Sequence, residues 1–378
     1  MDSKGKRNSA IDIIKAIFIL SVVVYHLVYR PQGSMPDRII RELIYLSLGG
    51  FFFLSGYFYR RDKAPLKKTI GHRMTSLLKP AVLTTAGLLF VFGPYQMIVR
   101  GYTFSDWLWD GVLNYLRPEF VSWFAPDHAV GGQLYENLSA VWFVWTLAWS
   151  SLLFYIIMHF CDNPKKTAVA LVVTIGIGSV LYVHAPNLPW SLQLTPLYSG
   201  IMMLGSICGR MKIVERLCEF NIWISTILAV PLAYMHFIIF DNFGSDLIYL
   251  GVLGNKTYVG AALFIVQLII GLYVVHVIAR FLQKVPVVNI ALEWVGRNTM
   301  TILLWHCTIG GLAADALHTY NKPGVNWYLN PLPAEVVVKS FATFLIGLAG
   351  CVFVVFLTNR IKANLRKLLR KSNFSSQN

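Results

Sequence analysis

Long apolar stretches recur along the whole chain and are separated by short polar connections. A membrane-spanning helix needs about 20 mainly apolar residues. Ten stretches come close to this length, and the sixth is the shortest. They cover residues 11–29, 43–59, 77–98, 138–160, 167–184, 194–209, 222–240, 258–281, 299–317 and 336–358. The pattern predicts an all-α, polytopic membrane protein with about ten transmembrane helices.

The two ends of the chain fit the same fold. The first stretch follows a basic N-terminus, as in a signal peptide, but it is too long for one and contains Asp12 and Lys15. We interpret it as a retained first transmembrane helix. We expect residues 1–378 to form one transmembrane domain, with a basic tail from about residue 359.

Composition narrows the class of protein. Only 13% of the residues are charged, 56% are hydrophobic and the mean hydropathy is +0.57. A soluble globular chain has about 25% charged residues. The net charge of +15 could suggest nucleic-acid binding, but here the basic residues punctuate apolar runs. We therefore expect a lipid bilayer, and no nucleic acid, as a partner.

The distribution of Lys and Arg predicts the orientation in the membrane. If the N-terminus is cytoplasmic, 24 of the 33 basic residues lie in cytoplasmic connections and 8 lie on the opposite side. Cytoplasmic connections of membrane proteins carry such an excess. The bias predicts an even number of spans, both termini in the cytoplasm, and a multi-pass protein of the cell (inner) membrane.

The cysteines give no sign of a disulfide framework or a metal site. The chain has five of them, none in a CxxC spacing, at Cys161, Cys208, Cys218, Cys307 and Cys351. Most lie in or beside apolar runs, where a thiol packs as a small apolar group. We expect no metal.

Ionisable side chains in the first span are the strongest functional signal. Such groups are costly in a bilayer and are often functional. Lys15 and His26 are eleven residues apart, so they share one helix face and lie about 16 Å apart along the axis. A structural alternative is that Lys15 reaches the headgroups while paired with Asp12, and that His26 is a packing histidine.

Three further groups of residues carry candidate chemistry. Ser55 lies in a stretch of small and aromatic residues at the end of the second span. The basic run that follows includes Arg73 and Lys79, and is either a determinant of topology or a phosphate-binding site. His306 lies inside the ninth span, where it is either functional or a buried packing residue. The connection 100–137 contains three Trp residues and is either an interfacial segment or a platform for a polar acceptor.

The motifs along the chain form an ordered set. They are Ile11-Asp12-Ile13-Ile14-Lys15, Tyr25-His26, Phe51-Phe52-Phe53-Leu54-Ser55-Gly56-Tyr57, the basic run reaching Arg73, Val141-Trp142-Phe143, the region of Gly205, and Gly296-Arg297-Asn298-Thr299 through Trp305-His306. In this order, over essentially the whole chain, the set resembles the acyltransferase-3 family of integral membrane acyltransferases. The resemblance implies transfer of acyl groups from cytoplasmic acyl-coenzyme A to hydroxyl groups of glycans or other envelope molecules.

The resemblance also implies roles for single residues. Lys15 and His26 match the family's basic residue, ten intervening residues and histidine in the first helix. Arg73 matches the first arginine of the family's Arg-x-x-Arg motif, whereas Ser76 replaces the second and Lys79 lies nearby. Because the second arginine is missing, the residues that contact coenzyme A can differ here from those of the family.

The predicted enzyme is an acetyl-CoA-dependent O-acetyltransferase. His26 would act as the general base that takes the proton of the acceptor hydroxyl, with an acyl-histidine intermediate as a variant. Lys15, Arg73 and Lys79 would bind the phosphates of acetyl-CoA, and Ser55 would lie near the thioester. Asp12, His306 and Trp142 would have supporting roles. The alternative function is a transporter or flippase for a lipid-linked glycan, and a structural role in an envelope assembly is a third reading.

Overall fold

A computed structural model describes most of the chain. The described residues are 8–28, 34–60, 65–100, 103–106, 141–186, 188–243, 257–317 and 334–375. Within these ranges every regular element is a helix, which confirms the all-α prediction. Most of the connection 100–137 lies outside the described residues, so its proposed role as an acceptor platform stays a prediction.

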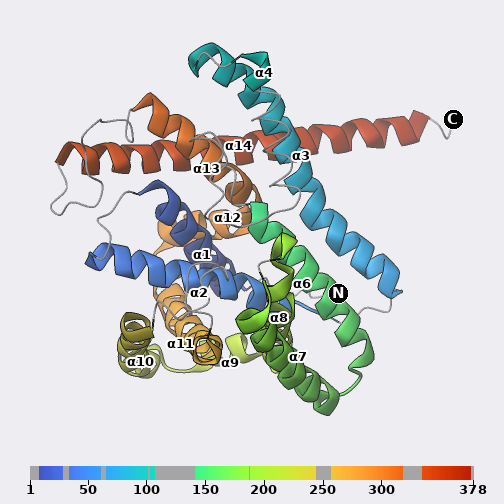
Figure 1. The fold of residues 1–378 in the computed structure, drawn as a ribbon, viewed down its shortest axis with the longest axis vertical. Helices are drawn as coiled ribbons and strands as arrows, with labels where there is room; N and C mark the ends of the chain where they lie inside the picture. Colours follow the sequence, from blue (N-terminus) through green and yellow to red (C-terminus); the bar gives the residue numbers. More distant parts are fainter. Residues whose placement is uncertain are drawn as a thin grey trace.

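Figure 1 shows the helices in chain order, from the N-terminal α1 to the C-terminal α14. In the N-terminal half they are α1 (Ser9–Leu27), α2 (Met35–Tyr57), α3 (Leu66–Arg100), α4 (Phe104–Asp106), α6 (Val141–Phe160) and α7 (Pro164–His184). In the C-terminal half they are η3 (Pro189–Leu194), α8 (Thr195–Arg210), α9 (Ile213–Glu219), α10 (Ile222–Phe243), α11 (Tyr258–Leu282), α12 (Pro286–Arg297), α13 (Thr299–Ala316) and α14 (Ala334–Ser375).

The helices support a multi-pass membrane protein. Among the described residues, seven helices are long and apolar enough to cross a bilayer: α1, α2, α6, α7, α10, α11 and α14. The other three predicted spans fall on α3, α8 and α13, which are helical as expected. α8 has only 16 residues, and the apolar part of α13 is the short segment Thr299–Ala314. The total of ten spans therefore stays a prediction.

The predicted C-terminal tail is helical. α14 is one continuous helix that runs through the basic segment predicted from residue 359 and ends at Ser375. In Figure 1 its C-terminal part (red) extends beyond the other helices. The tail is therefore a helical continuation of the last predicted span.

α1 lies at the centre of the helix bundle. It packs against α2, α11, α12, α13 and α14. Its buried side chains include Ile13, Phe18, Ile19 and Val23, all 0–1% exposed. α1 is therefore buried on several sides by protein, and this central place holds the polar residues that it carries close to other helices.

α2 and α8 meet through glycine at unusually close range. A Cβ atom added to Gly56 would lie 1.8 Å from the carbonyl oxygen of Met202, and one added to Gly205 would lie 2.0 Å from that of Phe53. Only residues without a side chain allow two backbones to approach so closely. Phe52 and Tyr198 stack beside this contact, with ring centroids 4.0 Å apart. The short eighth helix is thus a buried part of the bundle.

The segment before α8 has an unusual backbone. Trp190 and Ser191 in η3 have φ angles of 56° and 52°, in the left-handed region that non-glycine residues rarely occupy. The ring of Trp190 packs on Trp145 and Trp149 of α6, with centroids 5.8 and 5.4 Å apart. These aromatic contacts favour the strained turn that leads into α8.

Candidate functional site

The N-terminal part of α1 is tied to α12 by polar contacts. Asp12 is 2% exposed and lies 3.5 Å from the Lys15 Nζ atom and 3.6 Å from the Arg297 Nε atom. Arg297 also pairs with Glu293, one helical turn earlier in α12. A Cβ atom on Gly296 would lie 1.9 Å from the Asp12 carbonyl oxygen, so only glycine lets α12 approach α1 here. The predicted pairing of Asp12 with Lys15 is present, and Arg297 is an additional partner.

Two of the predicted coenzyme A residues meet the end of α2. The Lys15 Nζ atom lies 4.6 Å from the centre of the Phe58 ring. Arg73, in the second turn of α3, donates a hydrogen bond from Nη2 to the Ser55 Oγ atom at 3.1 Å. Since Ser55 and Phe58 are one turn apart, both cations lie against the C-terminal end of α2. We call Lys15, Ser55, Phe58 and Arg73 the basic cluster.

The electrostatics of the basic cluster favour an anion. The C-terminal end of a helix carries a partial negative charge that attracts cations. The last turn of α2 has no basic residue of its own, so the cations at this end come from α1 and α3. Arg73 is partly buried, and its buried Nε atom has no hydrogen-bond partner among the described residues. A guanidinium with a spare donor can bind a phosphate group. The basic cluster therefore has the chemistry that a phosphate-rich ligand needs.

The structure does not connect two other predicted site residues, Lys79 and Trp142, with the basic cluster. Lys79 lies in α3, is exposed, and is six residues beyond Arg73. Six residues turn an α-helix by about 240°, so Lys79 does not share the face of Arg73. Trp142 lies in the first turn of α6, and its side chain is outside the described residues. Their assigned roles stay predictions.

The other end of α1 carries the predicted base. His26 lies in the last turn of α1 and is exposed, whereas His306 of α13 is fully buried. The centres of the two rings are 5.3 Å apart. Cys307, also buried, places its Sγ atom 3.2 Å from the Nε2 atom of His306. We call His26, His306 and Cys307 the imidazole cluster.

Small residues bring these two helices together. Leu27 inserts between α13 and α14, where a Cβ atom on Gly310 would lie 2.0 Å and one on Gly347 would lie 2.6 Å from its methyl groups. Because Leu27 follows His26 directly, this insertion fixes the end of α1 against α13. The contact between His26 and His306 therefore depends on two glycines in other helices.

The protonation of His306 follows from its neighbours. Its Nδ1 atom lies 2.8 Å from the carbonyl oxygen of Leu303 and 3.2 Å from that of Ile302. A carbonyl oxygen can only accept, so Nδ1 carries a proton and donates it. In the neutral ring the Nε2 atom then has a free lone pair, which faces the Cys307 thiol. The sequence suggested His306 as a candidate but gave Cys307 only a packing role.

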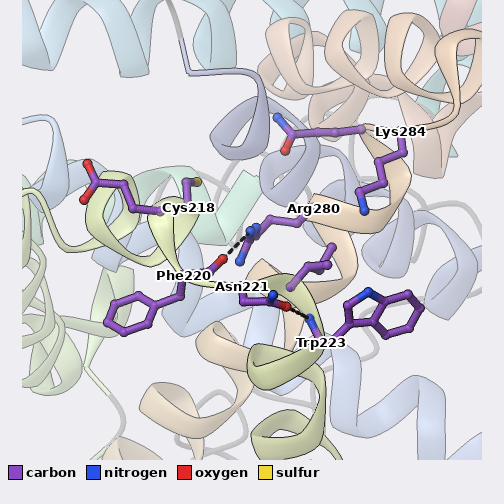
Figure 2. Close-up of a pocket in the computed structure, with 9 residues that line it drawn as sticks. Cys218, Phe220, Asn221, Trp223, Arg280 and Lys284 are labelled. Atoms are coloured by element: carbon purple, nitrogen blue, oxygen red, sulfur yellow. Dashed lines mark hydrogen bonds between the residues drawn. The ribbon is translucent and has the colours of Figure 1, made fainter.

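A cavity of about 590 Å³ lies elsewhere, where α9, α10 and α11 meet. Arg280 occupies its centre and donates hydrogen bonds to the carbonyl oxygens of Phe220 and Leu217 at 2.8 and 3.1 Å (Figure 2). Burial raises the pKa of the Cys218 thiol in its wall, which keeps that thiol protonated. None of the predicted site residues lines this cavity.

Comparison with known proteins places most of the chain in one family. The profile of the acyltransferase-3 family, described as an acyltransferase domain, matches residues 8–360. This range contains the basic cluster and the imidazole cluster and confirms the resemblance that the motifs suggested. A search of curated proteins finds no match for the chain.

Proposed function

Because this chain belongs to the acyltransferase-3 family, we propose that it transfers an acyl group from acyl-coenzyme A to a hydroxyl group of an envelope or exported glycan. The family and the apolar helices together establish a membrane acyltransferase. Acetyl-CoA as donor, a glycan as acceptor and His26 as base are parts of the proposal. No finding favours the alternative of a glycan flippase.

One observation carries the proposal: the two ends of α1 offer two different kinds of chemistry. The basic cluster, with Lys15 and Arg73, suits the phosphates of coenzyme A. The imidazole cluster, with His26 at its exposed edge, suits proton transfer. Lys15 and His26 are about 16 Å apart along the helix axis. An extended pantetheine arm is of comparable length, so a thioester could reach His26 while its nucleotide stays at the basic cluster.

In the proposed reaction, the neutral imidazole of His26 takes the proton of the acceptor hydroxyl. The oxygen attacks the thioester carbonyl carbon, the new ester bond forms, and the bond from carbon to the coenzyme A sulfur breaks. The leaving thiolate then takes the proton from the His26 imidazolium, which regenerates the base. His306 lies behind His26, with its proton held at Nδ1, and would orient the reacting ring.

The proposed function is tested by acyl transfer in membranes that contain the protein. Membranes are supplied with isotopically labelled acetyl-CoA, and the labelled ester on envelope glycans is measured by mass spectrometry. A general base contributes about 10²–10⁴-fold to the rate. We expect His26→Ala to reduce transfer by this factor.

His159→Ala is the matched control, because His159 is also exposed and lies near the end of another span. It should leave the rate within about twofold of the unaltered protein. A normal rate for His26→Ala protein at equal expression would exclude His26 as the base. Absence of any labelled ester, together with no thermal stabilisation by acetyl-CoA, would refute the proposed function itself.

A further inference from the structure

The imidazole cluster also has the composition of a metal site. His26, His306 and Cys307 each offer one ligand atom, and the three atoms lie within 4.8 Å of one another. Two nitrogen donors and one sulfur donor select a borderline or soft cation over Mg²⁺ or Ca²⁺, which prefer oxygen. The chain brings these donors together from α1 and α13, whose ligand residues are 280 positions apart in sequence.

The buried part of the cluster is already arranged for ligation. The Nδ1 atom of His306 donates to the carbonyl oxygen of Leu303, which leaves the Nε2 lone pair directed at the other members. Histidines that bind metals commonly donate their second ring nitrogen to a carbonyl or carboxylate in this way. The Cys307 Sγ atom is 3.2 Å from Nε2, so both atoms can reach one ion.

The geometry requires a small adjustment by one side chain. In a tetrahedral zinc site the nitrogen and sulfur ligands lie roughly 3.3–3.6 Å apart, given bonds of about 2.0–2.3 Å. The cluster must therefore close by about 1 Å. His26 is exposed in the last turn of α1, so its side chain is the one that can rotate, and an ion can enter from its side of the cluster.

We propose that His26, His306 and Cys307 form a binding site for Zn²⁺, and that zinc bound there inhibits acyl transfer. The inhibitory part rests on the proposed function, because zinc would occupy the lone pair with which His26 takes the acceptor proton. Three protein ligands leave the fourth position of the metal to water. The site would be regulatory because the bound ion blocks the proposed base.

The site is tested on the purified full-length protein in detergent. Zinc content is measured after dialysis, and Co²⁺ is added as a spectroscopic probe to a second sample from which a chelator has removed the zinc. We expect one zinc per chain and a thiolate-to-cobalt charge-transfer band. Cys307→Ser should abolish the band and weaken zinc binding at least tenfold, because it removes the thiolate ligand.

Cys208→Ser is the matched control, because Cys208 is a partly buried cysteine of α8 that does not belong to the cluster. It should keep both the band and the zinc content. Substoichiometric zinc and no thiolate band in the unaltered protein would overturn the proposal. So would stoichiometric binding that survives both Cys307→Ser and His306→Gln in proteins that melt cooperatively.

Inhibition is measured separately, as the zinc concentration that halves the rate of each variant relative to its own zinc-free rate. We expect this concentration to rise at least tenfold in Cys307→Ser and to stay unchanged in Cys208→Ser. Full activity with zinc bound would overturn the inhibitory part. Zinc bound by these residues in a protein that transfers no acyl group even after the zinc is removed would support the site and refute the proposed function, so the two failures are distinguishable.

Discussion

Arg73 shows how much of the donor site rests on one residue. Its guanidinium donates to Ser55 of α2, and its Nε atom is buried and keeps a spare donor. A buried cation is costly unless something pairs with it. A phosphate of coenzyme A would supply that partner, which links the arrangement of this side chain to the proposed donor.

Replacing Arg73 should weaken the donor far more than it slows the chemistry. A hydrogen bond to a charged group contributes about 1.5–3 kcal/mol, so Arg73→Gln should raise the KM for acetyl-CoA by about 10–150-fold. The measurement is the initial rate at varied acetyl-CoA. With acetyl-pantetheine, which lacks the nucleotide, the variant and the unaltered protein should behave alike.

Arg38→Gln is the control, because Arg38 is an exposed arginine of α2 that pairs with Asp241 away from the basic cluster. Its KM should not change. Equal KM values for Arg73→Gln and the unaltered protein would remove Arg73 from the donor site. A loss that persists with acetyl-pantetheine would assign Arg73 a structural role only.

Asp12 is a second residue whose negative charge pairs with cations of the site. It is buried between Lys15 and Arg297, and its carboxylate is the shared partner of both. Asp12→Asn removes that charge and leaves two cations facing each other. Breaking a fully buried ion pair costs about 3–5 kcal/mol, and half-exposed Arg297 makes the cost here smaller. We expect a clear loss of thermal stability and a raised KM for acetyl-CoA.

The matched control is Asp241→Asn, which breaks an exposed ion pair with Arg38. Exposed pairs contribute only about 0–1 kcal/mol. In detergent, the melting temperature of Asp12→Asn should therefore be clearly lower than that of Asp241→Asn. Similar melting temperatures for the two variants would mean that Asp12 does not organise the N-terminal part of α1.

At the scale of helices, the contact between α2 and α8 places the basic cluster. Backbone atoms of Phe53 and Met202 lie where side chains of Gly205 and Gly56 would be, so neither helix can shift without separating from the other. Ser55 and Phe58 belong to the end of α2 held by this contact. The packing of α2 against α8 therefore positions part of the basic cluster and also stabilises the fold.

Gly205→Ala should destabilise the protein, although alanine is normally the better helix former. The added methyl group would lie 2.0 Å from the Phe53 carbonyl oxygen, so the helices must move apart. Overpacking of this kind costs about 1–3 kcal/mol. The measurement is the melting temperature in detergent. Gly176→Ala in α7 is the control, since its new methyl group meets nothing within 4 Å.

The control should keep or raise the melting temperature, because alanine in a helix is worth up to about 1 kcal/mol over glycine. If Gly205→Ala behaved in the same way, the close approach of α2 and α8 would be wrong. A combined fall in stability and in affinity for acetyl-CoA would show that this contact positions the end of α2.

The helices were largely predictable, and their exceptions have physical reasons. As far as the structure describes them, the ten apolar stretches lie on helices, because runs of apolar residues in a bilayer must satisfy their backbone hydrogen bonds internally. The helical form of the basic tail was not predicted, since charges hide the continuation of α14 in a hydropathy pattern. The left-handed turn at Trp190 depends on packing against α6 and has no local signal.

Across the whole molecule, the sequence predicted the candidate residues that share one helix but not the contacts between helices. Lys15 and His26 could be placed on one face because they share a helix. The contact of His26 with Cys307 could not, because it depends on how Leu27 fits against α13 and α14. Cysteine spacing argued against a metal site, since spacing reports only ligands that are close in sequence.

The number of spans decides how both ends of the chain lie relative to the membrane. The seven helices that are individually long and apolar enough would put the two termini on opposite sides. Ten spans, with α3, α8 and α13 included, would put both termini on one side. Since α8 and α13 are short but packed against longer helices, we expect all three to cross with the rest.

Reporter fusions test this topology directly. A fluorescent protein that matures only in the cytoplasm, fused after Ser375, should be bright. The same reporter inserted after Lys212 should be bright, and one inserted after Ala185 should be dark, because α8 separates these two positions. A periplasmically active phosphatase should give the reverse pattern. A dark C-terminal fusion would favour an odd number of spans and remove the basis for placing the basic cluster beside cytoplasmic coenzyme A.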